Sequence, residues 1–231
     1  MNIKRANKQD YLKFAAICCM IIDHIGLYFV PNHFLLRAIG RIAFPIFAFY
    51  AGYNFKDKLN YKILAHGITL CLLSIVLTKK FLVPNILISI FLGQLYLLLY
   101  NKYPILNISL FLQYIILLVM WPFTKKYFEY GSIAILIMLI GSLHKQQILS
   151  TFQSANQICL ITILHSMIVF GKFFGNIDLV IWGIAMVSLW FALRSNINYL
   201  LPKMQWVRQI SRNSLYIYSI HLACFMIISR Y

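Results

Sequence analysis

YLKFAAICCMIIDHIGLYFV, residues Tyr11 to Val30, is the first long apolar run of the chain. A run of about 20 apolar residues is long enough to cross the hydrocarbon core of a bilayer as a helix. Past its middle, however, the run carries Asp23 and His24 side by side. A carboxylate near the centre of a membrane helix costs roughly 2.5–3.5 kcal/mol even on the mildest scale. The stretch therefore predicts a membrane helix whose acidic residue has a partner elsewhere in the chain, and it suggests a functional site.

The composition places the whole chain in the membrane class. Of its 231 residues, 61% are hydrophobic and 11% are charged, whereas soluble domains are about 45–50% apolar and about 25% charged. We expect a single transmembrane domain over residues 1–231. The formal net charge of +16 comes from short basic clusters between apolar runs. That pattern is typical of membrane topology and of contact with anionic lipid headgroups, and it argues against nucleic-acid binding.

The predicted fold is an all-α, polytopic membrane bundle of about nine transmembrane helices. The loop lysines and arginines favour a cytoplasmic N-terminus and an outward C-terminus, and the first span is expected to stay uncleaved because it lacks a small-residue cleavage site. Pro45 lies inside the second span, where a proline should kink the helix. The predicted spans are 12–30, 35–55, 62–79, 84–100, 104–122, 128–143, 156–173, 177–194 and 213–229.

Three of these spans carry polar residues that we expect to meet in one intramembrane pocket. Asp23 and His24 lie in the first span, and Arg37 and Arg41 lie one helical turn apart in the second. In the last span three residues are spaced i, i+4, i+7 and share one helix face. Neighbours on a helix point about 100° apart, so we expect Asp23 to pair with an arginine while His24 faces the pocket. The three residues of the last span are Ser214, Tyr218 and His221.

Each of these residues also has a purely structural explanation. Asp23 could form an ion pair that only locks two spans together, and His24 could be a satisfied core histidine. Arg37 could extend its side chain to the outer interface. Tyr218 could belong to the aromatic belt, and Ser214 could be an N-cap residue. The convergence of three spans favours a site, but the sequence leaves open whether His24 or His221 would be its base.

The other reactive side chains give weaker signals. The five cysteines all fall within apolar runs, form no CxxC pair and lack zinc-like spacing, so we expect small buried side chains. No Walker loop, GxSxG or HExxH motif is present in the sequence. A membrane-embedded histidine beside an Asp–Arg pair suits proton transfer to or from a reacting group. It suits a metal poorly, because the arginines would repel a cation, and we expect no metal.

Several stretches resemble one known family. The runs LKFAAICCMIIDHIG (12–26) and LLRAIGRIAFPIFAFYAGYNF (35–55) are similar to the TraX family, the F-pilin acetylation proteins. NSLYIYSIHL (213–222) resembles the terminal motif of that family. EYG (129–131) and PNILISIFLG (84–93) are similar to motifs in the interior of the family's sequences. The match is loose between about residues 95 and 205. The family is similar in turn to the membrane acyltransferases that O-acetylate polysaccharides.

The resemblance implies a function and roles for individual residues. It implies acetyl transfer in the bacterial inner (cytoplasmic) membrane, from acetyl-CoA to the N-terminal amine of pilin or to a related envelope acceptor. His24 matches the general base and Asp23 its acidic neighbour. Arg37 and Arg41 match the family's arginines and would bind substrate phosphate or a developing oxyanion. The terminal motif contributes His221 as a further catalytic candidate and Tyr218 and Ser214 as candidate substrate-binding residues.

Two other classes of function compete with an acetyltransferase. A small transporter could move an anion or a proton through the Asp–Arg–His pocket, and it predicts internal repeats or broken helices in matching positions. A non-catalytic membrane subunit of a secretion or pilus apparatus predicts that loss of His24 is harmless as long as the bundle folds. Dependence of coenzyme A release on His24 separates the enzyme from both.

Overall fold

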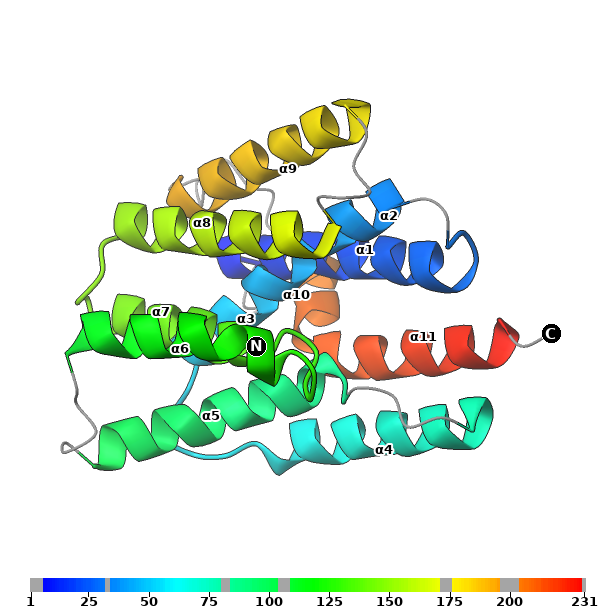
Figure 1. The fold of residues 1–231 in the computed structure, drawn as a ribbon, viewed down its shortest axis with the longest axis horizontal. Coiled ribbons are helices and arrows are strands. Elements are labelled where there is room, and N and C mark those ends of the chain that lie inside the picture. The colour runs from blue at the N-terminus through cyan, green and yellow to red at the C-terminus, as the bar shows by residue number, and fades with distance from the viewer. Residues whose placement is uncertain are drawn as a thin grey trace. The chain divides into compact units, whose positions relative to one another are not determined.

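The computed structural model describes residues 6–31, 34–79, 84–103, 109–170, 176–195 and 204–229. Throughout these ranges the regular secondary structure is α-helical (Figure 1), which confirms the all-α prediction. The helices are α1 (Lys8–Tyr28), α2 (Phe34–Gly40), α3 (Ala43–Tyr53), α4 (Tyr61–Thr78), α5 (Ile86–Lys102), α6 (Leu110–Thr124), α7 (Ser132–Lys145), α8 (Thr151–Phe170), α9 (Asn176–Arg194), α10 (Gln205–Arg212) and α11 (Ser214–Ile228).

Three stretches are long and apolar enough to cross a membrane: Lys8–Tyr28, Leu35–Tyr53 and Tyr61–Thr78. Shorter apolar helices follow, and each of the nine predicted spans overlaps one helix or, for 35–55, the pair α2 and α3. The chain is therefore a multi-pass helical membrane protein by length and composition. How many helices cross, and in which orientation, stays a prediction.

Exposed apolar side chains follow single faces of several helices. On α4 the exposed residues Ile68, Leu72 and Val76 recur every four positions, and on α9 the exposed residues Val180 and Ile184 do the same. Residues spaced by three or four positions lie on one side of a helix. Stripes of large apolar side chains that face outwards are unfavourable in water, and they fit contact with lipid chains.

The chain forms two compact units. The first consists of Met1–Phe47 and Thr151–Tyr231, and the second of Ala48–Ser150. In the first unit α1 contacts α2, α10 and α11, while α8 and α9 lie side by side (Figure 1). The helices that carry all the predicted site residues therefore belong to this one unit.

The N-terminus of α1 is tied to neighbouring helices by polar contacts. Asn7 and Asp10 form a capping box, in which each side chain accepts a hydrogen bond from the backbone N–H of the other. Asp10 also accepts a 2.6 Å hydrogen bond from the hydroxyl of Ser211, at the end of α10. Lys8 donates to the carbonyl oxygens of Leu193 (2.8 Å) and Ser195 (2.6 Å) at the end of α9. These bonds hold the start of α1 in place.

Small residues allow α1 and α2 to pack closely. A Cβ atom built on Gly40 of α2 would lie 2.1 Å from the Cβ atom of Asp23, and one on Gly26 of α1 would lie 2.9 Å from the Cβ of Leu36. The two helices therefore run antiparallel with their backbones almost in contact, as is common for helices in membranes. This close approach puts Asp23 directly against the helix that carries the arginines.

Pro45 interrupts the second predicted span. The helix ends at Gly40, Arg41 and Ile42 form a turn, and α3 resumes at Ala43. A proline three residues into α3 provides no N–H for the residue four positions earlier, which is Arg41, and its ring crowds that residue's carbonyl. The predicted kink is thus a full break, located at one of the two site arginines.

The second unit is built around α7. Its apolar residues, among them Leu136, Ile137 and Ile140 at 0% exposure, are buried on all sides. A Cβ atom built on Gly141 would lie 2.1 Å from the carbonyl oxygen of Phe49, so α3 and α7 also pack backbone to backbone. Contacts of α7 with α5 and α6 complete the core.

Several helix boundaries differ from the predicted spans. The helix predicted from residue 128 begins at Ser132, because Tyr130 (φ 68°) and Gly131 (φ 54°) form a left-handed turn that glycine adopts without strain. The polar stretch before residue 156 is already helical from Thr151. The basic loop after α9 contains the short helix α10, while residues 196–203 lie outside the described residues, as do 104–108 and 171–173 of the predicted spans.

Candidate functional site

Asp23 sits between two guanidinium groups. Nε of Arg37 lies 3.1 Å from Oδ1 of Asp23 and donates a hydrogen bond to it, and Nε of Arg41 lies 3.9 Å from the same oxygen. The side chains of all three residues are largely buried, at 10% exposure for Asp23, 19% for Arg37 and 11% for Arg41. Both arginines that the sequence offered as partners therefore contact the carboxylate, with Arg37 the nearer.

The local sequence explains this geometry. Arg37 and Arg41 are four positions apart, so one turn of α2 and its exit place both on the side facing α1. Between them, Gly40 lies against Asp23 with no room for a side chain. The glycine therefore lets the carboxylate lie close to both arginines.

The two histidines meet across α1 and α11. Nδ1 of His24 lies 2.6 Å from Nε2 of His221, and their ring centroids are 4.8 Å apart. Nδ1 of His221 in turn lies 2.7 Å from the carbonyl oxygen of Ile217, one turn earlier in α11. The result is a chain of hydrogen bonds from a backbone carbonyl through one imidazole to the next.

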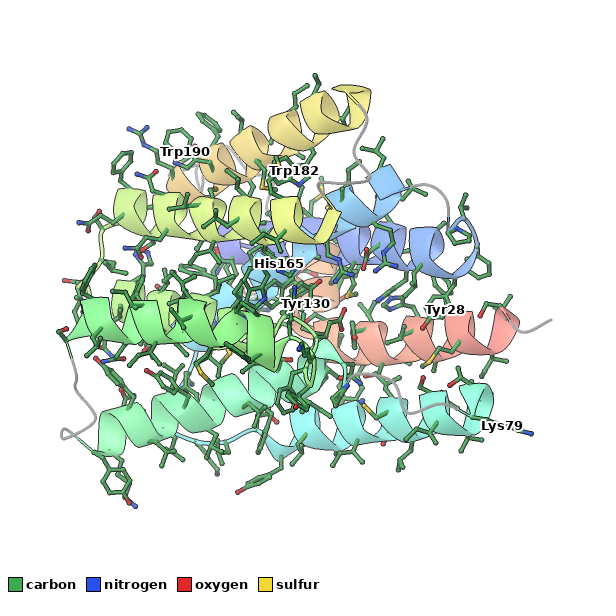
Figure 2. The ribbon with its side chains drawn as sticks, in the orientation of Figure 1. Tyr28, Lys79, Tyr130, His165, Trp182 and Trp190 are labelled. Carbon is green, nitrogen blue, oxygen red and sulfur yellow. The ribbon has the colours of Figure 1, made fainter. Side chains whose placement is uncertain are left out.

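Aromatic rings pack around the histidine pair. The ring of Tyr218 lies 5.9 Å from the rings of both His24 and His221, measured between centroids. Tyr28, in the last turn of α1 (Figure 2), lies 6.4 Å from the His24 ring. Tyr218 and His24 are both buried, at 6% and 8% exposure. The aromatic rings thus hold the two imidazoles in a mainly apolar surrounding.

The contacts also fix the directions of the helices. His24 pairs with His221, and Phe29 packs against Phe225 with ring centroids 5.1 Å apart. Residue numbers rise together along the two helices, so α1 and α11 run parallel. The N-terminal ends of the first and last predicted spans therefore lie at the same end of this helix pair. The predicted orientation, in which both spans begin on the cytoplasmic side, is consistent with this arrangement.

Ser214 stands apart from this cluster. It is the first residue of α11 and lies seven positions before His221, which is about 10 Å along a helix at 1.5 Å per residue. Its side chain makes no hydrogen bond to the residues that the structure describes. The structure therefore brings together Asp23, His24, Arg37, Arg41, Tyr218 and His221 and leaves Ser214 outside.

Other polar residues within the helices have ordinary structural roles. Gln94 accepts a 3.0 Å hydrogen bond from the backbone N–H of Asn60, and Gln113 accepts a 2.8 Å bond from the hydroxyl of Tyr96. These bonds connect α5 to the start of α4 and to α6. Glu129, which precedes α7, accepts a 3.1 Å hydrogen bond from the backbone N–H of Ile86 at the start of α5. It therefore caps α5.

Two contributors to the site were not among the predicted residues. The carbonyl of Ile217 orients His221, but a backbone group has no sequence signal. Gly40 permits the approach of α2 to Asp23, and its position between the two arginines was the available clue. Among the described residues, no group of three or more His, Cys, Asp or Glu side chains could hold a metal ion.

The arrangement combines a proton-accepting imidazole pair with a cluster of two arginines and one aspartate. Two guanidinium groups contact one carboxylate, and these three largely buried side chains together carry a formal charge of +1. Such a charge favours anionic groups or oxygens that become negative during a reaction. The adjacent imidazole pair can take up and return a proton.

Comparison with known proteins identifies the relatives of this chain. The model of the TraX protein family matches residues 8–229. An uncharacterized protein of Rickettsia prowazekii (strain Madrid E) is 33% identical over 230 residues, which covers 94% of this chain and 90% of that protein. No solved structure matches the chain. The chain belongs to the TraX protein family.

Proposed function

We propose that this protein is an integral membrane acetyltransferase that moves an acetyl group from acetyl-CoA to an acceptor amine or hydroxyl. Family membership supports the reaction class, because TraX proteins are associated with acetylation of F-pilin. The observation that carries the proposal is the buried histidine pair beside an Asp–Arg–Arg cluster of formal charge +1. The location is the bacterial inner membrane, and the acceptor is pilin or another envelope molecule.

The proposed reaction is a single acyl transfer. Acetyl-CoA supplies the acetyl group as a thioester. The acceptor nitrogen or oxygen forms a bond to the acetyl carbon while the bond from that carbon to sulfur breaks. His24 takes the proton that the acceptor loses and returns it to the departing sulfur. General base catalysis of this kind contributes about 10²–10⁴-fold to the rate.

Asp23, Arg37 and Arg41 have an electrostatic role in this proposal. The donor carries phosphates, and the carbonyl oxygen becomes negative as the acceptor attacks. Fixed guanidinium groups in a water-poor site stabilise such charge far better than water does. Asp23 holds both guanidinium groups in position, since its Oδ1 contacts each of them. Tyr218 packs against both imidazoles and shields them from water.

The test uses the full-length protein in nanodiscs of bacterial phospholipid with acetyl-labelled acetyl-CoA. Coenzyme A release and label transfer to envelope extract are measured for the wild type, for His24→Ala and for His165→Ala. His165 is the matched control, because it is a buried histidine on α8, at 7% exposure against 8% for His24. We expect His24→Ala to lose at least about 100-fold in turnover and the control to retain it.

Two outcomes would contradict the proposal in different ways. Folded His24→Ala protein with wild-type turnover would exclude His24 as the base. Folded wild-type protein that neither binds nor consumes acetyl-CoA would exclude the acetyltransferase. In that case, anion or proton flux into proteoliposomes that depends on His24 would identify a transporter.

A further inference from the structure

The hydrogen bonds of His221 determine which of its nitrogens carries a proton. Nδ1 of His221 lies 2.7 Å from the carbonyl oxygen of Ile217. A carbonyl oxygen can only accept a hydrogen bond, so Nδ1 of His221 must carry the hydrogen and donate it. This bond adds to the helical hydrogen bond that the same carbonyl receives in α11, because an oxygen has two lone pairs.

The same reasoning extends to His24. A neutral imidazole has one N–H, so Nε2 of His221 has no hydrogen and is an acceptor. Nδ1 of His24, at 2.6 Å, must therefore donate to it. That leaves Nε2 of His24 as the nitrogen with a free lone pair, and it makes no hydrogen bond to the residues that the structure describes. In this arrangement a proton can be added to the pair only at that atom.

We propose that His221 is a positioning residue that holds His24 in its Nδ1–H tautomer, so that Nε2 of His24 is the nitrogen that takes the proton of the acceptor. This inference rests on the proposed function and resolves which of the two histidines is the base. His221 acts through His24 and does not itself touch the reacting atoms. The carbonyl oxygen of Ile217 in α11 fixes the donor-to-acceptor direction of both hydrogen bonds, because it can only accept.

A histidine in this role suits the charges of the site. In many hydrolases a carboxylate orients the catalytic histidine, but here the carboxylate of Asp23 is bound to Arg37 and Arg41. A neutral imidazole orients His24 without adding negative charge, so the Asp23–Arg37–Arg41 cluster keeps its formal charge of +1. When Nε2 of His24 takes up a proton, its bond to His221 becomes charge-assisted and stronger.

The tautomer can be observed directly by NMR. Protein with 15N-labelled histidine side chains is prepared in nanodiscs at a pH where the imidazoles are neutral, and the signals of His24 among the six histidines are assigned with His24→Gln. We expect Nδ1 of His24 to carry the hydrogen in the wild type. In His221→Phe, which keeps a ring but offers no acceptor, we expect the hydrogen to shift to Nε2.

A second variant adds a functional readout. The side-chain oxygen of Gln in His221→Gln can replace Nε2 as acceptor for His24. We expect His221→Phe to lower kcat by 100-fold or more with KM changed less than threefold, since a wrong tautomer in a serine protease costs about 10⁴. We expect His221→Gln to recover at least a tenth of the wild-type kcat and to retain the Nδ1–H tautomer.

The NMR result decides the inference independently of the reaction. A wild-type His24 with its hydrogen on Nε2 overturns it, and so does an Nδ1–H tautomer that survives in folded His221→Phe. Equal kcat values for folded His221→Phe and wild type also overturn it. A protein with the expected tautomers but no acetyl transfer would instead contradict only the proposed function.

Discussion

The helices α1 and α7 are both central to their units, and they differ in what they bury. α7 buries almost only apolar side chains, with Leu136, Ile137 and Leu139 at 0% exposure. α1 buries Asp23 and His24 along with its apolar residues. Both helices pack backbone to backbone through glycine, α7 against α3 and α1 against α2. The packing solution is the same, and only the chemistry of the buried groups differs.

This difference supports the first unit as the location of the proposed site. Replacing a buried ion pair by apolar residues of similar size is often neutral or stabilising, by up to about 4 kcal/mol. Among its described residues, the second unit forms a helical core that buries no Asp, Glu, Lys, Arg or His side chain. The ionisable cluster of the first unit is therefore not explained by stability, and the site is its simplest explanation. Three substitutions test this contrast, and two of them have a matched control variant.

The largest effect is expected from splitting the ion cluster. Asp23→Asn leaves Arg37 and Arg41 buried beside an uncharged amide, and breaking a buried pair in this way costs about 3–5 kcal/mol. We expect the free energy of unfolding to fall by that amount, as measured by denaturation in mild detergent. Turnover should fall as well, because the guanidinium groups lose their anchor.

A matched control removes the whole cluster. The triple variant Asp23→Leu, Arg37→Met, Arg41→Met makes the first unit resemble the second. We expect it to unfold at least as late as the wild type and to have no measurable acetyl transfer. A triple variant as unstable as Asp23→Asn would show that the cluster is needed for folding. That result would contradict the conclusion that stability does not explain the ionisable residues of the first unit.

A smaller loss of stability is expected when a methyl group is added in the second unit. The Cβ atom of Gly52→Ala would lie 1.9 Å from the carbonyl oxygen of Met138, so α3 and α7 must move apart. Overpacking of this kind costs about 1–3 kcal/mol. We expect a lower melting temperature with unchanged turnover per folded molecule, because Gly52 belongs to the second unit.

Gly183→Ala is the control for Gly52→Ala. Outside the backbone of α9 itself, no atom of the described residues lies within 4 Å of a Cβ built on Gly183, and alanine favours a helix by up to about 1 kcal/mol over glycine. We expect an unchanged or slightly raised melting temperature. Equal melting temperatures for Gly52→Ala and Gly183→Ala would rule out the close packing of α3 and α7.

The smallest effect is expected from Ser214→Ala. The residue lies about 10 Å along α11 from His221, and its hydroxyl has no hydrogen bond to the described residues. Ser214 is half-buried, and a substitution that removes no buried contact or hydrogen bond changes stability by about 0.5 kcal/mol or less. We expect turnover within twofold of the wild type in the coenzyme A release assay. A tenfold or larger loss of turnover would show that Ser214 takes part in the site.

Much of the fold could be predicted because membrane helices are local features. A membrane span such as residues 12–30 can be recognised from its length and its apolar composition, without knowledge of any distant contact. Where prediction failed, a local backbone detail decided the outcome. The turn at Gly131 delays the start of α7, and Pro45 divides the second span at Arg41 and Ile42. The sequence showed both residues, but not how far their effects reach.

The sequence by itself determined that this is a helical membrane protein and which polar side chains its spans contain. The cost of a charge in lipid makes Asp23 conspicuous wherever it lies. Only the tertiary structure decided that Arg37 is the nearer partner and that His24 meets His221, a residue 197 positions away. The free energy of transfer into lipid is a sum over the residues of one segment, so it can be read from the sequence. A hydrogen bond of 2.6 Å depends on the register of two helices, and that register is a property of the packed bundle.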